Sequence, residues 1–296
     1  MNTNTEELKY ENRLVAFIDI LGFKEIIKAS EFNSSKLKLI YEILLFLKTR
    51  EKPEEWNLQL IEIEEDVQKK GVGNFDIASK TSCTCFSDSI VVSVQVGDNN
   101  INEATSTLIA NLSLIGAKLM TEGILFRGAI TIGNIIHKDN GLIMGQALID
   151  AYQLETNIAK NPRIVLSNKL LGLLNFPITT KKNRYPYHQY INRFDDGCVG
   201  FHQMIYFEVL QSWTEMETTK LKVELKKIKQ TIIEGLDSSF EFADIHNKFK
   251  WLKTEYERLV ILEDDIKEKI YELNNGIAGQ NIHYAYTDNF YYPKKD

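Results

Sequence analysis

The stretch that decides the fold is RLVAFIDI, residues 13–20, which is followed at once by LGF, residues 21–23. An unbroken run of aliphatic, β-branched and aromatic residues predicts a buried strand, and the helical spacing up to residue 48 predicts that this strand leads directly into a helix. Asp19 lies inside the apolar run. A carboxylate among apolar neighbours is costly unless it is paired, hydrogen-bonded or bound to a metal. The sequence therefore predicts a partner for Asp19.

A second aspartate, Asp88, stands in the same kind of surroundings. Residues 81–96, TSCTCFSDSIVVSVQV, indicate two strands that are broken around Asp88, which is typical of a hairpin. If the first strand pairs with this hairpin, Asp19 and Asp88 lie side by side at one end of the sheet, where they can share Mg²⁺ or Mn²⁺ ions about 3.5 to 4 Å apart. Either aspartate alone is more simply a turn residue. The pair favours metal binding.

The turn after Asp19 supports an anionic ligand. Leu21, Gly22 and Phe23 lead into a helix, and the first N–H groups of a helix can bind a phosphate. Gly22 alone is weak evidence.

The rest of the first 210 residues alternates between strand and helix patterns. We expect a charged insertion or loop at 51–80, helices at 102–121 and 147–159, and strands at 124–133, around 142–145, at 163–167 and at 201–210. This order predicts an α+β domain with one mostly antiparallel sheet.

From about residue 214 the pattern changes to two long amphipathic helices, with a break near Gly235. We therefore expect the α+β domain to span residues 1–210 and a C-terminal helical extension to span 211–296, which packs on the core or on a dimer partner. The aromatic tail after Asn275 is expected to pack against the protein.

Composition limits the possible partners and locations. The net charge is −6 and the pI is about 5.6, which argues against nucleic-acid binding as the main activity. Three cysteines give no disulfide framework, and the N-terminal residues have neither the basic start nor the apolar run of a signal peptide. No apolar run is long enough to span a bilayer. We expect a cytoplasmic protein without a membrane segment.

The motifs, taken in order, resemble a known family. FIDILGF is similar to the first metal-binding strand and phosphate turn of class III nucleotide cyclases, and FSDSIVVS is similar to their hairpin with the second metal aspartate. FRGAITIG, GLIMG, ALIDAYQLE and PRIVLS resemble the following strand, glycine pair, helix and phosphate-binding strand of that family. The resemblance implies a ferredoxin-like βαββαβ sheet and two divalent ions per active site, held by Asp19, Ile20 and Asp88.

Within this family the motif sequences are most similar to those of the pyrimidine cyclases of the bacterial Pycsar anti-phage systems. These enzymes make cyclic UMP or cyclic CMP, which activates a downstream effector. Thr84 and Leu142 align with positions that read the base in purine cyclases, and neither carries the purine-reading side chain. The resemblance therefore favours a pyrimidine nucleoside triphosphate as substrate. The residues do not separate UTP from CTP, and UTP is placed ahead of CTP because uridylate enzymes are the commoner branch of the resembling group.

The resemblance also assigns residues to phosphate chemistry. Arg163 aligns with a triphosphate-binding basic residue, and Arg127 is a candidate for stabilising charge in the transition state, although a structural ion pair explains it equally well. Ile149 and Gln153 replace the helix Asn and Arg of purine cyclases. The family forms its active sites between two subunits, which implies a homodimer. A catalytically silent nucleotide-binding or dimerisation module and a purine cyclase with a rebuilt base pocket remain as alternatives.

The cysteines and histidines show no metal-binding pattern. Cys83 and Cys85 lie two apart on a predicted strand, without a Cys or His cluster nearby in the sequence, and we expect them in the core. His137, His188 and His202 have no ligand spacing, and we expect structural roles for them.

Overall fold

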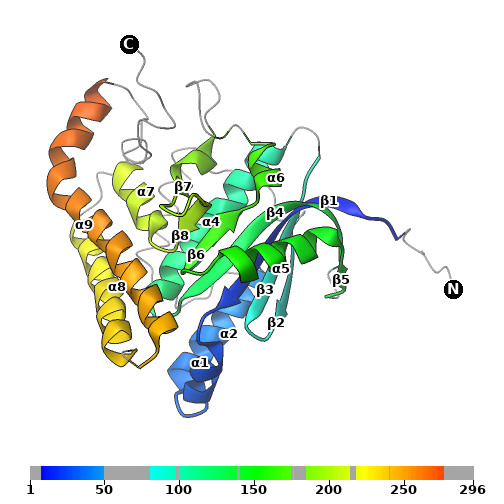
Figure 1. The fold of residues 1–296 in the computed structure, drawn as a ribbon, viewed down its shortest axis with the longest axis horizontal. Helices are drawn as coiled ribbons and strands as arrows, with labels where there is room; N and C mark the ends of the chain where they lie inside the picture. Colours follow the sequence, from blue (N-terminus) through cyan, green and yellow to red (C-terminus); the bar gives the residue numbers. More distant parts are fainter. Residues whose placement is uncertain are drawn as a thin grey trace.

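A computed structural model describes residues 8–49, 81–97, 100–138, 141–174, 176, 185–213, 218–239 and 241–276. Within these residues the chain forms one sheet with helices on both of its faces (Figure 1). The expected insertion at 51–80 and the aromatic tail lie outside the described residues.

The sheet has the order β2-β3-β1-β4-β6-β8-β7, with β5 added to the end of β4. The strands are β1 (Glu11–Ile20), β2 (Thr81–Phe86), β3 (Ser89–Gln95), β4 (Phe126–His137), β5 (Ile143–Met144), β6 (Arg163–Leu166), β7 (Asn192–Arg193) and β8 (Val199–His202). All pairs are antiparallel except β4 with β6. The expected mostly antiparallel sheet is therefore confirmed.

The helices are α1 (Phe23–Ser30), α2 (Ser34–Thr49), α4 (Ile101–Thr121), α5 (Gln146–Ile158), α6 (Asn168–Leu171), the 3₁₀ turn η3 (Pro186–Gln189), α7 (Ile205–Trp213), α8 (Thr218–Ser238) and α9 (Ala243–Gly276). The order β1, α1–α2, β2, β3, α4, β4 with the sheet order β2-β3-β1-β4 is the ferredoxin-like βαββαβ arrangement. The α+β fold class is thus confirmed by the strand order of this chain.

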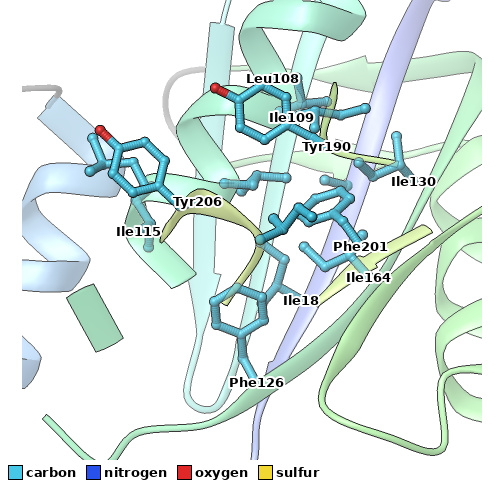
Figure 2. Close-up of a cluster of buried hydrophobic side chains, with 14 of the residues drawn as sticks. Ile18, Leu108, Ile109, Ile115, Phe126, Ile130, Ile164, Tyr190, Phe201 and Tyr206 are labelled. Atoms are coloured by element: carbon cyan, nitrogen blue, oxygen red, sulfur yellow. The ribbon is translucent and has the colours of Figure 1, made fainter. Parts of the chain in front are cut away.

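Alternate residues of β1 enter two different cores, as strand geometry requires. Leu14 and Ile18 belong to the large cluster beneath α4, whereas Val15 and Phe17 pack with Ala147 and Ala151 of α5. Figure 2 shows part of the large cluster, in which Ile18, Phe126, Ile130, Ile164 and Phe201 from four strands lie near Leu108, Ile109 and Ile115 of α4. Asp19, next to Ile18, therefore lies on the α5 face together with Phe17.

Two expected elements were wrong. Residues 201–210 were expected to form a strand, but β8 ends at His202 and α7 begins at Ile205. The run from Met204 to Phe207 is buried on every side, and an apolar run without exposed positions carries no periodicity that separates helix from strand. The helix after β1 is also divided into α1 and α2, with a break at residues 31–33.

The C-terminal helices pack on the same chain. Leu225, Ile228 and Ile232 of α8 and Leu252 and Leu259 of α9 are buried in the cluster that includes the sheet. In Figure 1 the two helices form a hairpin beside α7 at the side of the molecule. None of the helices in the described ranges is long and apolar enough to cross a membrane.

Candidate active site at one end of the sheet

The register of β1 brings Asp19 and Asp88 together. Asp19 lies opposite Ser89 of β3, and the backbone N–H of Ile20 donates to the carbonyl of Asp88 at 2.9 Å. Asp88 acts on Asp19: burial raises the pKa of Asp19, and the charge of Asp88 raises it further. The predicted pairing of the first strand with the hairpin is confirmed, and it places both aspartates at the same end of the sheet.

Arg127 compensates the charge of Asp19. It lies directly opposite Asp19 on β4, and its Nε donates to Asp19 Oδ2 at 3.1 Å. The same Nε lies 2.6 Å from Oε1 of Glu155 on α5, yet this oxygen has no hydrogen-bond partner among the described residues. The Arg127 N–H is therefore directed at Asp19, and its contact with Glu155 is an attraction between charges without a hydrogen bond.

Glu155 is a site residue that the sequence analysis missed. Its side chain is 2% exposed, and burial raises its pKa while the Arg127 charge opposes this rise. A usable signal was present, because Ala147, Ala151 and Glu155 follow each other at four-residue spacing on the buried face of α5. A carboxylate in line with two buried alanines indicates a buried partner of opposite charge.

Helix α9 brings a second cation, Lys248, near this end of the sheet. Burial lowers the pKa of Lys248, the charge of Arg127 lowers it further, and the charges of Asp244, Asp19 and Glu155 raise it. One turn further along α9, the Trp251 ring lies 5.9 Å from Cζ of Arg163 on β6. The extension therefore borders the site, which no spacing in the sequence indicated.

The turn after β1 has the conformation that a glycine favours. Gly22 has φ +68° and is the N-cap of α1, without a side-chain cap. The N–H of Leu21 donates to the Leu125 carbonyl at 2.8 Å, so this N–H is already used within the protein. The phosphate-binding role expected for Leu21, Gly22 and Phe23 therefore depends on the N–H groups from Gly22 onward.

Arg163 is deeply buried and already paired. Its side chain is 1% exposed, and it donates to both carboxylate oxygens of Asp196, with Nη1 at 3.1 Å from Oδ1. The Phe194 ring lies 4.6 Å from its Cζ. A phosphate at Arg163 would have to share the guanidinium with Asp196, and the triphosphate-binding role stays a prediction.

Thr84 lies near Gly141, the residue that precedes Leu142. Thr84 is 9% exposed, and its Oγ1 lies 2.8 Å from Nε2 of His137. A Cβ added to Gly141, next to Leu142, would lie 4.0 Å from Thr84 Cγ2. Leu142 itself is 50% exposed. Thr84 is thus close to Gly141, and the expected contact of Thr84 and Leu142 with a base stays a prediction.

The acidic residues fit a divalent ion that arrives with a phosphate ligand. Among the described residues, no group of three or more Cys, His, Asp or Glu side chains could hold a metal by itself. Mg²⁺ is usually bound by one or two carboxylates together with substrate phosphates and water, and its ligands are hard oxygens. Asp19, Asp88 and the Ile20 carbonyl provide such a partial set.

Cys83 and Cys85 are half-buried and pack against the large core cluster, as expected. His137, His188 and His202 are all buried. No metal-binding cluster includes them within the described part of the chain.

No family model matches the chain, and no curated protein matches it. It is similar to several solved structures. The guanylyl cyclase Cya2 is 12% identical over 64% of this chain and 90% of that chain, with a TM-score of 0.33. The guanylyl cyclase domain of a RhoGC fusion protein from Blastocladiella emersonii is 13% identical over 66% of this chain and 96% of that chain, with a TM-score of 0.34. A class III adenylyl cyclase-like ATP-binding protein from Pseudomonas aeruginosa is 11% identical over 60% of this chain and 38% of that chain, with a TM-score of 0.31. At these values the fold assignment rests on the strand order of this chain.

Proposed function

We propose that this protein is a class III nucleotide cyclase that converts a pyrimidine nucleoside triphosphate, UTP before CTP, into its 3′,5′-cyclic monophosphate and pyrophosphate. The observation that carries the proposal is the β1–β3 register, which brings two carboxylates from distant parts of the chain to one end of the sheet. The turn at Gly22 follows directly on the first of them. Paired carboxylates beside a helix N-terminus are suited to a metal–triphosphate complex.

The site residues have different roles in an in-line displacement at the α-phosphorus. Asp19, Ile20 and Asp88 would hold two divalent ions, which when bound activate the ribose 3′-hydroxyl and neutralise phosphate charge. The 3′ oxygen attacks the α-phosphorus, the bond from the α-phosphorus to the oxygen that bridges it to the β-phosphorus breaks, the hydroxyl proton passes to water, and pyrophosphate leaves. The N–H groups from Gly22 onward bind the departing phosphates, and Arg163 would join them by sharing its guanidinium between Asp196 and a phosphate oxygen. Catalysis then consists mainly of positioning and electrostatic stabilisation.

Arg127 has the free donors that this role needs. Its Nε is bound to Asp19, whereas its terminal nitrogens make no hydrogen bond or ion pair with other described residues. The side chain is 21% exposed, so a ligand can reach it. A guanidinium with two unoccupied terminal nitrogens can bind two phosphate oxygens at once. This supports Arg127 as the group that stabilises charge at the reacting phosphorus.

The proposed biological setting follows from the resemblance to the Pycsar cyclases. The product would be a second messenger in anti-phage defence, and its partner would be an effector that binds the cyclic nucleotide. The active sites would be shared in a homodimer. Exposed apolar side chains on β5 and α5 and in the turn before β5 support such a contact: Leu142, Met144, Ile149 and Tyr152 are each at least 41% exposed.

A catalytically silent module is the second candidate. Two observations favour it: Ile149 and Gln153 stand where purine cyclases have polar catalytic residues, and the Asp19 carboxylate is engaged by Arg127. In that case the protein would bind a nucleotide or dimerise without turnover. A purine cyclase with a different base pocket is the third.

One assay separates these candidates. Purified protein is incubated with Mn²⁺ and each of the four ribonucleoside triphosphates in turn, and the products are identified by mass. Cyclic UMP, with less cyclic CMP, is the expected result. Turnover of ATP or GTP would support the purine cyclase, and absence of pyrophosphate release from all four would exclude the enzyme.

A further inference from the structure

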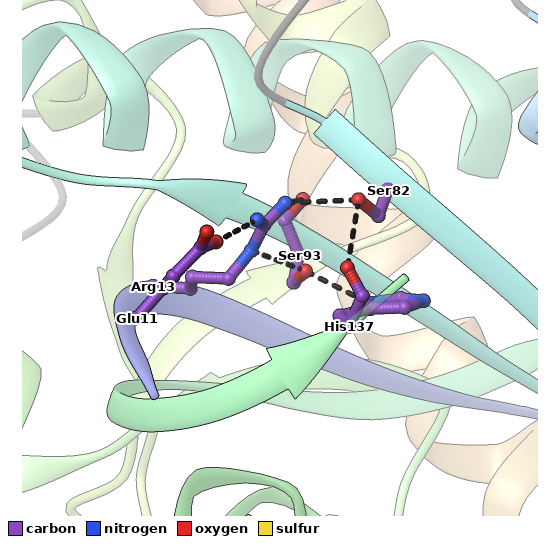
Figure 3. A network of polar contacts seen from close by, with 5 residues as sticks. All are labelled: Glu11, Arg13, Ser82, Ser93 and His137. Atoms are coloured by element: carbon purple, nitrogen blue, oxygen red, sulfur yellow. Dashed lines mark hydrogen bonds and ion pairs between the residues drawn. The ribbon is translucent and has the colours of Figure 1, made fainter. Parts of the chain in front are cut away.

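A chain of buried polar side chains crosses the α5 face of the sheet and ends at Thr84. Arg13 Nε donates to Ser93 Oγ at 2.8 Å, Ser93 Oγ lies 2.8 Å from His137 Nδ1, and His137 Nε2 lies 2.8 Å from Thr84 Oγ1. Each of these side chains belongs to a residue that is at most 9% exposed. Figure 3 shows Arg13, Ser93 and His137 in line, with Glu11 and Ser82 beside Arg13. Four strands thus fix the surroundings of one hydroxyl group.

The direction of each hydrogen bond follows from Arg13. A guanidinium only donates, so Ser93 Oγ accepts from Arg13 and needs an acceptor for its own proton. His137 Nδ1 is the other partner of Ser93 Oγ, so Nδ1 accepts and carries no proton. His137 is therefore neutral, with its proton on Nε2.

This tautomer determines what Thr84 offers to a ligand. His137 Nε2–H donates to Thr84 Oγ1, so the Thr84 hydroxyl proton is directed away from His137. A hydroxyl group whose oxygen already accepts a hydrogen bond within the protein has its proton left to donate to a ligand. Of the pyrimidines, uracil presents an acceptor at O4, as thymine does, whereas cytosine presents an amino donor at N4.

We infer that His137 is a positioning residue which fixes Thr84 as a hydrogen-bond donor and thereby selects uracil over cytosine in the substrate. The inference rests on the proposed cyclase function and on Thr84 facing the base. It gives a structural reason to expect UTP rather than CTP as the substrate. His137 does not touch the nucleotide and acts through Thr84.

The first test measures kcat/KM for UTP and for CTP. Wild-type protein should prefer UTP at least about tenfold, a difference that one hydrogen bond can supply. His137→Asn keeps an acceptor toward Ser93 and loses the donor toward Thr84, so the UTP to CTP ratio should fall toward one. Thr84→Val should do the same, and Thr84→Ser should restore the ratio. The control is Ser113→Ala on α4, where an equally buried hydroxyl bonds, among the described residues, only the Ile109 carbonyl, and it should leave the ratio unchanged. A wild-type preference for CTP, or an unchanged ratio in His137→Asn, would overturn the inference while leaving the cyclase intact.

The second test does not need turnover. Nitrogen-15 NMR of the wild-type protein, with the His137 signal identified by its loss in His137→Asn, reports the protonation of both ring nitrogens. A proton on Nε2 alone is expected. A proton on Nδ1, or on both nitrogens at neutral pH, would refute the inference even if no nucleotide is turned over. Absence of turnover with all four nucleotides would by contrast refute the proposed function.

Discussion

At the scale of single residues, Asp19 shows how a costly position in the sequence indicates a partner. The carboxylate lies among apolar residues, burial raises its pKa, and Arg127 and Asp88 lie beside it. The need for compensation was predictable from Asp19 alone. The identity of the compensating residue was only partly predictable. Arg127 could equally stabilise charge in the transition state or form a structural ion pair, and Glu155 lies 136 positions away from Asp19 on another element.

Glu155 should hold Arg127 between two carboxylates. In Glu155→Gln the guanidinium loses one negative neighbour and pairs more closely with Asp19, so it competes better with a divalent ion. We expect a several-fold higher Mn²⁺ concentration for half-maximal turnover, with a fold that is retained. A Mn²⁺ titration of turnover measures this. The control is Glu241→Gln, which removes the same charge at an exposed position. An equal increase in the required Mn²⁺ concentration in both variants would contradict the proposed role of Glu155.

At the scale of secondary structure, α4 and α5 were predictable from their helical spacing, and β1 was predictable from an unbroken run rich in β-branched and aromatic residues. The helix α7 was not, because its run from Met204 to Phe207 is buried on all sides. The place of α9 beside Arg127 and Arg163 was also not predictable. An amphipathic pattern shows that a helix is buried on one face, but it does not show which surface covers that face.

The pairing of β1 with β4 depends on Gly128. A Cβ at this position would lie 2.6 Å from the Phe17 carbonyl oxygen, so the two strands would have to separate. We expect Gly128→Ala to lower the free energy of unfolding by about 1 to 3 kcal/mol, as overpacking does. Urea unfolding measures this change. Gly97→Ala, where the nearest atom to a Cβ is 4.0 Å away, should change the free energy little, and equal effects of both substitutions would contradict the argument.

The turn between β7 and β8 supports β6 through Asp196. Burial raises the Asp196 pKa, but hydrogen bonds from Arg163 and the Cys198 N–H lower it more, so the net pKa is below 3.8. The folded state then binds fewer protons than the unfolded state, and this stability is present above the unfolded pKa and lost as the pH falls through the folded pKa. Asp196→Asn should cost about 1 to 2 kcal/mol at neutral pH, because the Asp196 side chain is half exposed and partly screened while Arg163 is buried.

Urea unfolding of wild type and Asp196→Asn at several pH values tests this prediction. The difference between the two proteins should shrink as the solution becomes acidic, because wild-type Asp196 then also loses its charge. A difference that stays constant from neutral to acidic pH would show that the ion pair with Arg163 is not its source.

At the scale of the whole molecule, the proposed homodimer makes the activity depend on protein concentration. Ile149 on α5 is 48% exposed, next to the other exposed apolar side chains of this face. Ile149→Glu should shift the protein toward monomers in sedimentation experiments and lower the specific activity at low protein concentration. Ile233→Glu on α8, where the side chain is 40% exposed, is the matched control. Equal behaviour of the two variants would argue against a dimer through α5.

The central claim is that Asp19 and Asp88 bind the same pair of cations, and direct Mn²⁺ binding tests it best. Electron paramagnetic resonance counts bound Mn²⁺ per chain in the presence of a non-reactive UTP analogue. Wild type should bind two ions. Asp19→Ala and Asp88→Ala should each lose this binding and all turnover while unfolding like wild type, and the exposed Asp237→Ala should bind as wild type does. Wild-type Mn²⁺ binding in either active-site variant would contradict the account.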